Sequence, residues 1–158
     1  MNTVGRLAAS GQETADIIAF QLGNEAFCVR TTRVREIRGW MPCMPLPGSP
    51  PDVMGVINLR GAVIPIIDLS MRLGLRQTEA NERSAIIVTE TADKVVGLLV
   101  DRVTDMLNIS LGDVQPVPAA GGAMARACAE GILTVGEGMI CFLDLDAIYA
   151  DERASWAA

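Results

Sequence analysis

The feature that most constrains this fold is a repeat inside the chain. Residues 55–69 (GVINLRGAVIPIIDL) align without a gap with residues 131–145 (GILTVGEGMICFLDL), 76 positions later. An earlier block, residues 20–37, aligns with residues 89–106 at a spacing of 69, so the second copy carries a seven-residue insertion. Any two β-hairpins look somewhat alike, but the kept order of both blocks favours a duplication. Four aligned pairs are identical: Gly55/Gly131, Ile64/Ile140, Asp68/Asp144 and Leu69/Leu145.

Short strands joined by tight turns are expected throughout. Apolar, β-branched runs flank Gly23-Asn24 and Arg60-Gly61, which predicts a hairpin at each place. Residues 41–52 contain five prolines, and because proline cannot donate to a strand ladder, this segment is predicted to be an extended connection. Asp68 is expected to cap a short helix over residues 68–75, and Asp146 another near the end of the chain.

These elements predict a domain organisation. Residues 1–16 are small and polar and are expected to form a flexible tail. The first unit spans about residues 17–75, a charged linker covers residues 76–83, and the second unit spans about residues 84–145. Residues 146–158 are expected to form a C-terminal helix and tail. Units this small have thin cores, so two of them would stabilise each other across an apolar seam, and such a seam leaves a groove for a partner.

The composition excludes several classes of protein. The hydrophobic fraction is 50%, the charged fraction is 20% and the net charge is −6. This apolar content excludes disorder as the main state, and no apolar run approaches the ~18 residues of a membrane span. The negative charge disfavours nucleic acid and anionic lipid as partners. The N-terminus lacks the apolar region of a signal peptide, so a cytoplasmic protein is expected. The apolar surplus suggests exposed docking surfaces.

A search for catalytic chemistry finds little. The chain has no histidine, which removes Ser-His-Asp and Cys-His arrangements, and it lacks nucleotide-binding and nucleophile-elbow motifs. The four cysteines are widely spaced and are expected to be reduced core residues. Asp68 and Asp144 are interpreted as helix caps rather than a catalytic carboxylate pair. A small hydrolase using Cys or Asp is the alternative from another class. No enzyme activity, cofactor or metal is expected.

Comparing the two copies singles out one arginine. The turn of the first copy is Asn58-Leu59-Arg60-Gly61, whereas the second copy has Gly136 where the first has Arg60. Because a structural turn does not need arginine there, Arg60 is predicted to be functional, although a solvated turn charge is the alternative. A guanidinium suits a carboxylate or backbone carbonyls on a partner. Glu36 lies in an apolar, β-rich context and is expected either to pair with Arg60 or to face a partner.

Several motifs together resemble the CheW domain, over about residues 17–149. The block at residues 55–69 is the most specific of them, and the others add to it. The matching motifs are F-x-L-G-x-E-x-F (20–27), V-x-E-I-x-G (34–39), P-L-P-x-x-P (45–50), GVINLRGxVIPIIDL (55–69), VVGLLVDxVxD (95–105) and L-D-L (143–145). With no kinase or receiver segment in the sequence, the chain resembles a stand-alone adaptor. The five prolines and the N-terminal tail depart from the pattern.

The resemblance implies an all-β fold of two tandem SH3-like five-stranded barrels packed on a shared core, with short helices. It implies a non-enzymatic adaptor that couples the cytoplasmic tips of methyl-accepting receptors to the regulatory domain of the histidine kinase CheA, recruited to membrane-associated arrays where further adaptor copies can join rings. An adaptor of a non-flagellar chemosensory pathway is the alternative. The implied receptor-binding residues, in the groove between the barrels, are Glu36, Ile37, Asn58, Arg60, Val103 and Met106.

Overall fold

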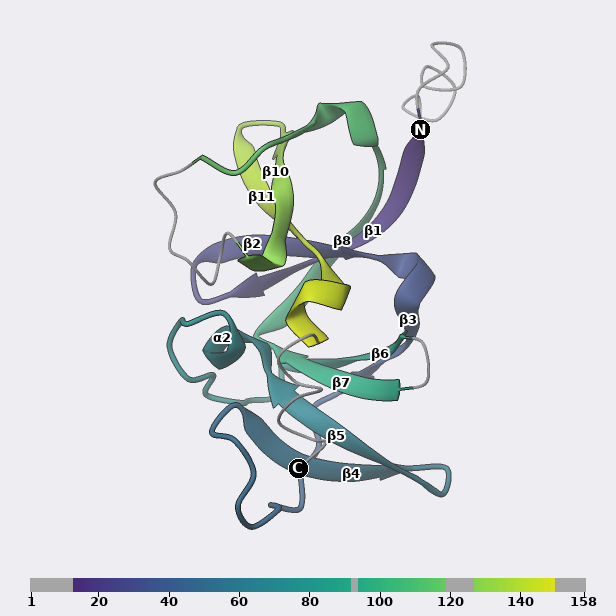
Figure 1. Cartoon of the computed structure of the whole chain (residues 1–158), viewed down its shortest axis with the longest axis vertical. Helices are drawn as coiled ribbons and strands as arrows, with labels where there is room; N and C mark the ends of the chain where they lie inside the picture. The colour runs from purple at the N-terminus through teal and green to yellow at the C-terminus, as the bar shows by residue number, and fades with distance from the viewer. Residues whose placement is uncertain (1–12, 92–93, 119–126, 150–158) are drawn as a thin grey trace.

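The computed structural model describes residues 13–91, 94–118 and 127–149. Within these residues the strands form two sheets, one above the other in Figure 1. The first has the order β8-β1-β2-β11-β10-β9 and the second the order β3-β6-β7-β5-β4. The first sheet contains β1 (Thr14–Leu22), β2 (Glu25–Arg30), β8 (Arg102–Ser110), β9 (Val114–Gln115), β10 (Ala129–Val135) and β11 (Gly138–Leu143). The second contains β3 (Val34–Gly39), β4 (Val53–Leu59), β5 (Ala62–Asp68), β6 (Ala85–Thr91) and β7 (Lys94–Val100).

Besides the strands, the described residues contain the short helices η1 (Thr31–Arg33), α2 (Leu69–Arg72) and η2 (Leu111–Asp113). A further helical turn covers residues 145–149, which we call the C-terminal turn. It lies between the two sheets in Figure 1. No helix in the described part of the chain is long and apolar enough to cross a membrane.

The two sheets do not follow the division at residues 76–83 into consecutive units. The first hairpin of the chain, β1–β2, joins β8–β11, whereas β3–β5 join β6 and β7. Each copy therefore gives its first hairpin to the sheet built by the rest of the other copy. Sequence alone cannot show this exchange, because the two hairpins have similar lengths and similar apolar patterns.

The exchange has the same register in both sheets. Strand β5 pairs with β7 in parallel, with Ile66 opposite Gly97, and β11 pairs with β2 in parallel, with Phe142 opposite Cys28. Ile66 and Phe142 are 76 positions apart, and Cys28 and Gly97 are 69 apart, which are the two spacings of the sequence repeat. The strand order agrees as well, since β8-β1-β2-β11-β10 corresponds to β3-β6-β7-β5-β4. This equivalence supports the predicted duplication.

Three apolar clusters occupy the described part of the chain, and the middle one is shared. One cluster lies within the first sheet and one within the second. The shared cluster takes side chains from both sheets and from the C-terminal turn. In β1, Ile17 faces the cluster of its own sheet while its neighbour Ile18 faces the shared cluster. Strands buried on both faces need nearly continuous apolar sequence, which accounts for the high apolar content.

The predicted hairpin turn and the predicted Asp68 cap are present, whereas two other predictions differ from the structure. The hairpin turn at Gly23-Asn24 is present, with Leu22 opposite Glu25. Asp68 caps α2, because its Oδ1 accepts from the amide of Met71 at 3.4 Å. The C-terminal turn is capped by Asp144, whose Oδ1 accepts from the amide of Asp146 at 3.0 Å. This confirms the interpretation of Asp144 as a helix cap, whereas the prediction of a cap at Asp146 is wrong. Strand β1 begins at residue 14, inside the expected tail.

Candidate functional site

The turn between β4 and β5 holds Arg60 in an unusual backbone conformation. Arg60 has φ 51° and Gly61 has φ 91°, so both central residues of this two-residue turn lie at positive φ, the geometry of a type I′ hairpin turn. Asn58 Oδ1 accepts from the amide of Gly61 at 3.0 Å and so supports the turn. Arginine in the left-handed region costs about 1–2 kcal/mol relative to its usual conformations. Gly136 occupies the same place in the second copy, with φ 60°.

Glu36 holds the guanidinium of Arg60. Glu36 Oε1 pairs with Arg60 Nη2, and Glu36 Oε2 accepts from Arg38 Nη1 at 3.2 Å. The Glu36 side chain is 26% exposed and that of Arg60 is 67% exposed. Glu36 lies on β3, the edge strand at one side of the second sheet, while Arg60 follows β4 at the other edge. The ion pair therefore joins the two edges of this sheet.

This cluster carries a net positive charge, because two guanidinium groups surround one carboxylate. Most of the Arg60 side chain remains in contact with solvent, and a guanidinium has five donors, so it can accept a second, planar partner. The arrangement suits recognition of a carboxylate or of backbone carbonyls. An exposed pair contributes only about 0–1 kcal/mol to folding, so folding stability gives little reason to keep Arg60 at this strained position.

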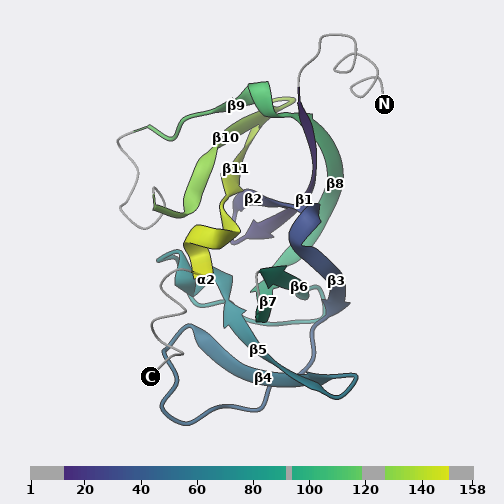
Figure 2. The same ribbon diagram turned by 45° about the vertical axis from the view of Figure 1, so that its right-hand side comes forward.

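The structure divides the other expected site residues between the two sheets. Ile37 on β3 and Val103 on β8 are half-buried, and both pack against the shared cluster. Figure 2 shows β3 and β8 on one side of the molecule, away from α2. Met106 also lies on β8 and is 68% exposed. Asn58 is exposed beside Arg60. Glu36, Asn58 and Arg60 thus form one polar group, while Ile37, Val103 and Met106 are apolar positions on β3 and β8, each the edge strand of its own sheet.

The sequence did not identify three residues that lie on or beside β3, β4 and β5. Arg38 shares the Glu36 carboxylate, and alternation along β3 could have indicated this, because Arg38 and Glu36 are two apart. Val63 is 66% exposed and lies opposite Asn58 in the hairpin. Met44 is 63% exposed and pairs with Val56 on the free edge of β4. The run of apolar residues in this region concealed that these two side chains face solvent.

With this geometry known, comparisons with other proteins become informative. The sequence model of the CheW-like domain matches residues 16–153. The chain belongs to the CheW family. It is 46% identical over 152 residues to the chemotaxis protein CheW of Rhizobium meliloti, with 96% of each chain covered. It is 32% identical over 153 residues to the chemotaxis protein CheW of Klebsiella aerogenes, covering 96% of this chain and 90% of that one. Protein FrzA of Myxococcus xanthus is 30% identical over 120 residues, with 76% and 75% covered.

A solved structure extends the CheW likeness to the fold. The scaffolding protein TtCheW of Thermoanaerobacter tengcongensis superimposes with a TM-score of 0.79 at 29% identity, covering 87% of this chain and 88% of that one. This confirms the predicted all-β fold of two SH3-like barrels on a shared core. One sheet has five strands, as expected, and the other has a sixth, the two-residue β9.

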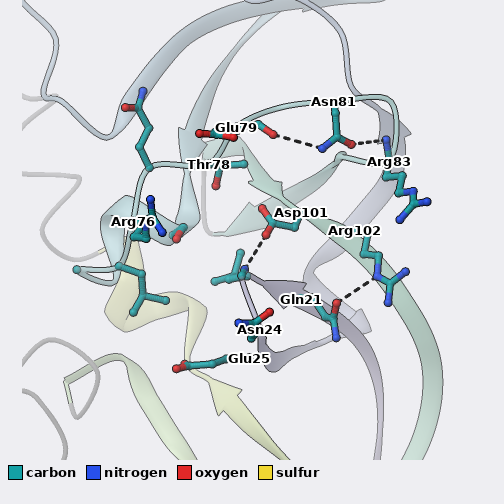
Figure 3. Close-up of a pocket in the computed structure, with 16 residues that line it drawn as sticks. Gln21, Asn24, Glu25, Arg76, Thr78, Glu79, Asn81, Arg83, Asp101 and Arg102 are labelled. Atoms are coloured by element: carbon teal, nitrogen blue, oxygen red, sulfur yellow. Dashed lines mark hydrogen bonds between the residues drawn. The ribbon is translucent and has the colours of Figure 1, made fainter.

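A concave surface lies apart from the six residues that the resemblance implies. An open cavity of about 1110 Å³ is bounded by the β1–β2 turn, the segment after α2 and the start of β8. Figure 3 shows that charges of both signs surround it, among them Arg76, Glu79 and Arg102. Asp101 Oδ2 accepts from the amide of Gly23 at 2.6 Å, and so ties two of the walls together. None of the six residues implied by the resemblance lines it.

The cysteines give no support to a thiol-based hydrolase. Burial raises the pKa of the Cys28 thiol from 9.0 to about 12, with a smaller contribution from Cys141. Burial also raises the pKa of Cys43 and of Cys141 above the usual value. A catalytic cysteine needs the opposite shift, because the thiolate is the nucleophile. Within the described residues there is also no group of three or more Cys, Asp or Glu side chains arranged to hold a metal ion.

Proposed function

We propose that this chain is a non-enzymatic chemotaxis adaptor that couples the cytoplasmic tips of methyl-accepting receptors to the histidine kinase CheA. One observation carries the proposal. Arg60 keeps a strained conformation that its counterpart Gly136 adopts without strain, and its guanidinium is oriented by Glu36 yet largely exposed. Strain that the fold does not require is typical of functional positions. Family membership and the named chemotaxis relatives supply the partners.

In this proposal the receptor's helical hairpin lies along the apolar positions on β3 and β8. Ile37, Val103 and Met106 contact the apolar face of the helix, and Arg60, supported by Asn58, pairs with a carboxylate or carbonyl on it. Burial of apolar area supplies affinity, and the charged group supplies orientation. The adaptor is cytoplasmic and is recruited to receptor arrays, where the kinase and further adaptor copies join it in rings.

The direct test measures binding of a soluble receptor-tip hairpin by titration calorimetry. Arg60→Ala is expected to weaken binding by about 2 kcal/mol, roughly thirtyfold, as for an interface hot spot. Arg76→Ala is the matched control, because Arg76 is an exposed arginine that lines the cavity described above, away from Arg60, and it should bind like the unchanged protein. Equal affinity of both variants would remove Arg60 from the site.

Reconstitution tests the coupling itself. The chain is mixed with CheA and receptor-bearing membranes, and kinase autophosphorylation and co-sedimentation are measured. Kinase activity should depend on the chain, and the chain should sediment with the membranes. No change in either quantity would refute the adaptor function.

A second candidate is an adaptor serving a chemosensory pathway with another output. The match to Protein FrzA of Myxococcus xanthus favours keeping this candidate. Pull-down of the kinase and receptors from the source cell distinguishes the two candidates, because the same fold would bind different partners.

A further inference from the structure

Arg72 makes a buried connection between α2 and the C-terminal turn. Its Nη1 donates to Asp52 Oδ2 at 2.9 Å, and its Nε and Nη2 donate to the carbonyl oxygen of Ile148 at 3.3 and 3.2 Å. The two charged side chains are only 10% and 12% exposed. One guanidinium thus joins the segment before β4, the helix after β5 and the last described turn of the chain. We call this group the Arg72 clamp.

The second copy shows that the fold does not require this ion pair. Seventy-six residues later, Cys128 stands where the first copy has Asp52, and Ile148 stands where it has Arg72. Both are buried apolar side chains, 3% and 0% exposed. The backbone is nevertheless the same, because one amide–carbonyl contact recurs at 2.7 Å in each copy, Asp68 to Asp52 and Asp144 to Cys128. A buried ion pair is often no more stabilising than well-packed apolar residues, so its retention calls for another explanation.

The C-terminal turn connects the clamp with the strands that carry Ile37 and Val103. Ile148 and Tyr149 are buried in the shared cluster. The Tyr149 hydroxyl bonds to Thr89 Oγ1 on β6, and Thr89 is the cross-strand partner of Val34 on β3. Val34 and Ile37 on β3, together with Val103 on β8, pack against this same cluster. A shift of the turn would therefore change the packing beneath both β3 and β8.

We propose that Arg72 is a positioning residue for partner binding: by holding the carbonyl of Ile148, it fixes the C-terminal turn and thereby the spacing of β3 and β8. Arg72 itself does not touch the partner. The clamp itself is given by the contacts above, its effect on β3 and β8 is the inference, and only the consequence for receptor affinity rests on the proposed function.

The test transplants the residues of the second copy into the first. The double variant Asp52→Cys/Arg72→Ile, kept under reducing conditions, removes the clamp without leaving Asp52 buried and unpaired. Three quantities are measured on the full chain: hydrogen exchange of the amides in residues 145–149, methyl NMR shifts of Ile37 and Val103, and affinity for the receptor-tip hairpin. The methyl group of Ile57, in the cluster confined to the second sheet, is the internal control.

The expected result is at least about tenfold faster exchange in the C-terminal turn, shifted Ile37 and Val103 methyl signals with Ile57 unchanged, and roughly fivefold weaker binding. Arg72→Lys lacks the planar fork that reaches both acceptors and should show the same changes to a smaller extent. Arg72→Lys provides the test if the double variant does not fold. Unchanged methyl shifts overturn the inference, whatever the exchange rate. If the unchanged protein does not bind the hairpin, the proposed function fails, and exchange and shifts still decide the clamp.

Discussion

Two equivalent glycines allow the repeat geometry to be tested by adding one methyl group. A Cβ built on Gly55 would lie 2.2 Å from the carbonyl oxygen of Met44, and one on Gly131 would lie 2.4 Å from the carbonyl oxygen of Gln115. Both oxygens belong to backbone segments that pair with the glycine's own strand. A contact this short cannot be relieved by rotating a side chain. The substitutions Gly55→Ala and Gly131→Ala should therefore push each segment off its strand.

The structure ranks the expected losses of unfolding free energy. Overpacking costs about 1–3 kcal/mol, which gives about 2 kcal/mol for Gly131→Ala. Gly55 also has φ 148°, a conformation that alanine adopts at a cost of roughly 1–3 kcal/mol, so Gly55→Ala should lose about 3–4 kcal/mol. Gly48 has φ 77° with no atom within 4 Å of its Cβ position, so Gly48→Ala should lose only about 1 kcal/mol.

Gly39→Ala completes the set as the matched control, because its Cβ would meet nothing within 4 Å and its φ is not in the positive range. It should be neutral or stabilising by about 0.5 kcal/mol, since alanine restricts the unfolded chain. That entropic gain is common to all four variants and cancels in the ranking. Urea unfolding followed by circular dichroism gives the free energies. If Gly131→Ala were as stable as Gly39→Ala, the segment at Gln115 would not lie against β10, and the equivalence of the two copies would fail there.

Three further predictions concern the core and the connection between the copies. Burial raises the pKa of Cys28 to about 12 from 9.0, so above about pH 9 the native state keeps a proton that the unfolded state loses. The free energy of unfolding should therefore fall above about pH 9, by up to about 1.4 kcal/mol per pH unit. The urea midpoint of Cys28→Ala should fall less steeply with pH, and parallel curves for the two proteins would contradict this. Asp68→Ala should lower the free energy of unfolding by about 2–3 kcal/mol in the same assay, because Asp68 accepts hydrogen bonds from the Thr78 amide at 2.9 Å and the Thr78 hydroxyl at 2.8 Å. A loss under about 0.5 kcal/mol would show that these hydrogen bonds are unimportant. Chain fragments 1–79 and 80–158 should each be largely unfolded and should regain the native circular dichroism only when mixed, since each sheet needs strands from both; a folded single fragment would refute the exchange.

Much of the local structure could be predicted because its causes are local. Two-residue turns and the Asp68 cap depend on a few neighbouring residues. The exchange of hairpins could not be predicted, because β2 and β7 have interchangeable patterns and nothing local states which copy a hairpin joins. At the C-terminal turn the sequence offered both Asp144 and Asp146 as caps, because they are two residues apart and either can precede a helix; Asp144 is the cap.

The candidate site was partly predictable for a different reason. The repeat supplied an internal control, and it singled out Arg60 against Gly136 without any structure. The partner of Arg60 was one of two alternatives left open for Glu36, and the ion pair between them is present. The placement of Ile37, Asn58, Val103 and Met106 as contacts for a receptor stays a prediction. The role of Arg38 depends on a contact across one strand, which alternation implied but did not specify.

The exchange also explains why a duplicated adaptor would keep its copies joined. Strand β3 comes from the first copy and pairs with β6 of the second, while β8 comes from the second and pairs with β1 of the first. Strands β3 and β8 are thus each paired with a strand of the other copy, and residues of both pack on a cluster that neither copy builds alone. The positions of β3 and β8 therefore depend on contacts from both copies. This dependence is consistent with the role proposed for the Arg72 clamp, while the two copies differ at their turns. Arg60 and Gly136 show such a difference. Both have the same left-handed backbone conformation, but only Arg60 has a charged side chain, which pairs with Glu36.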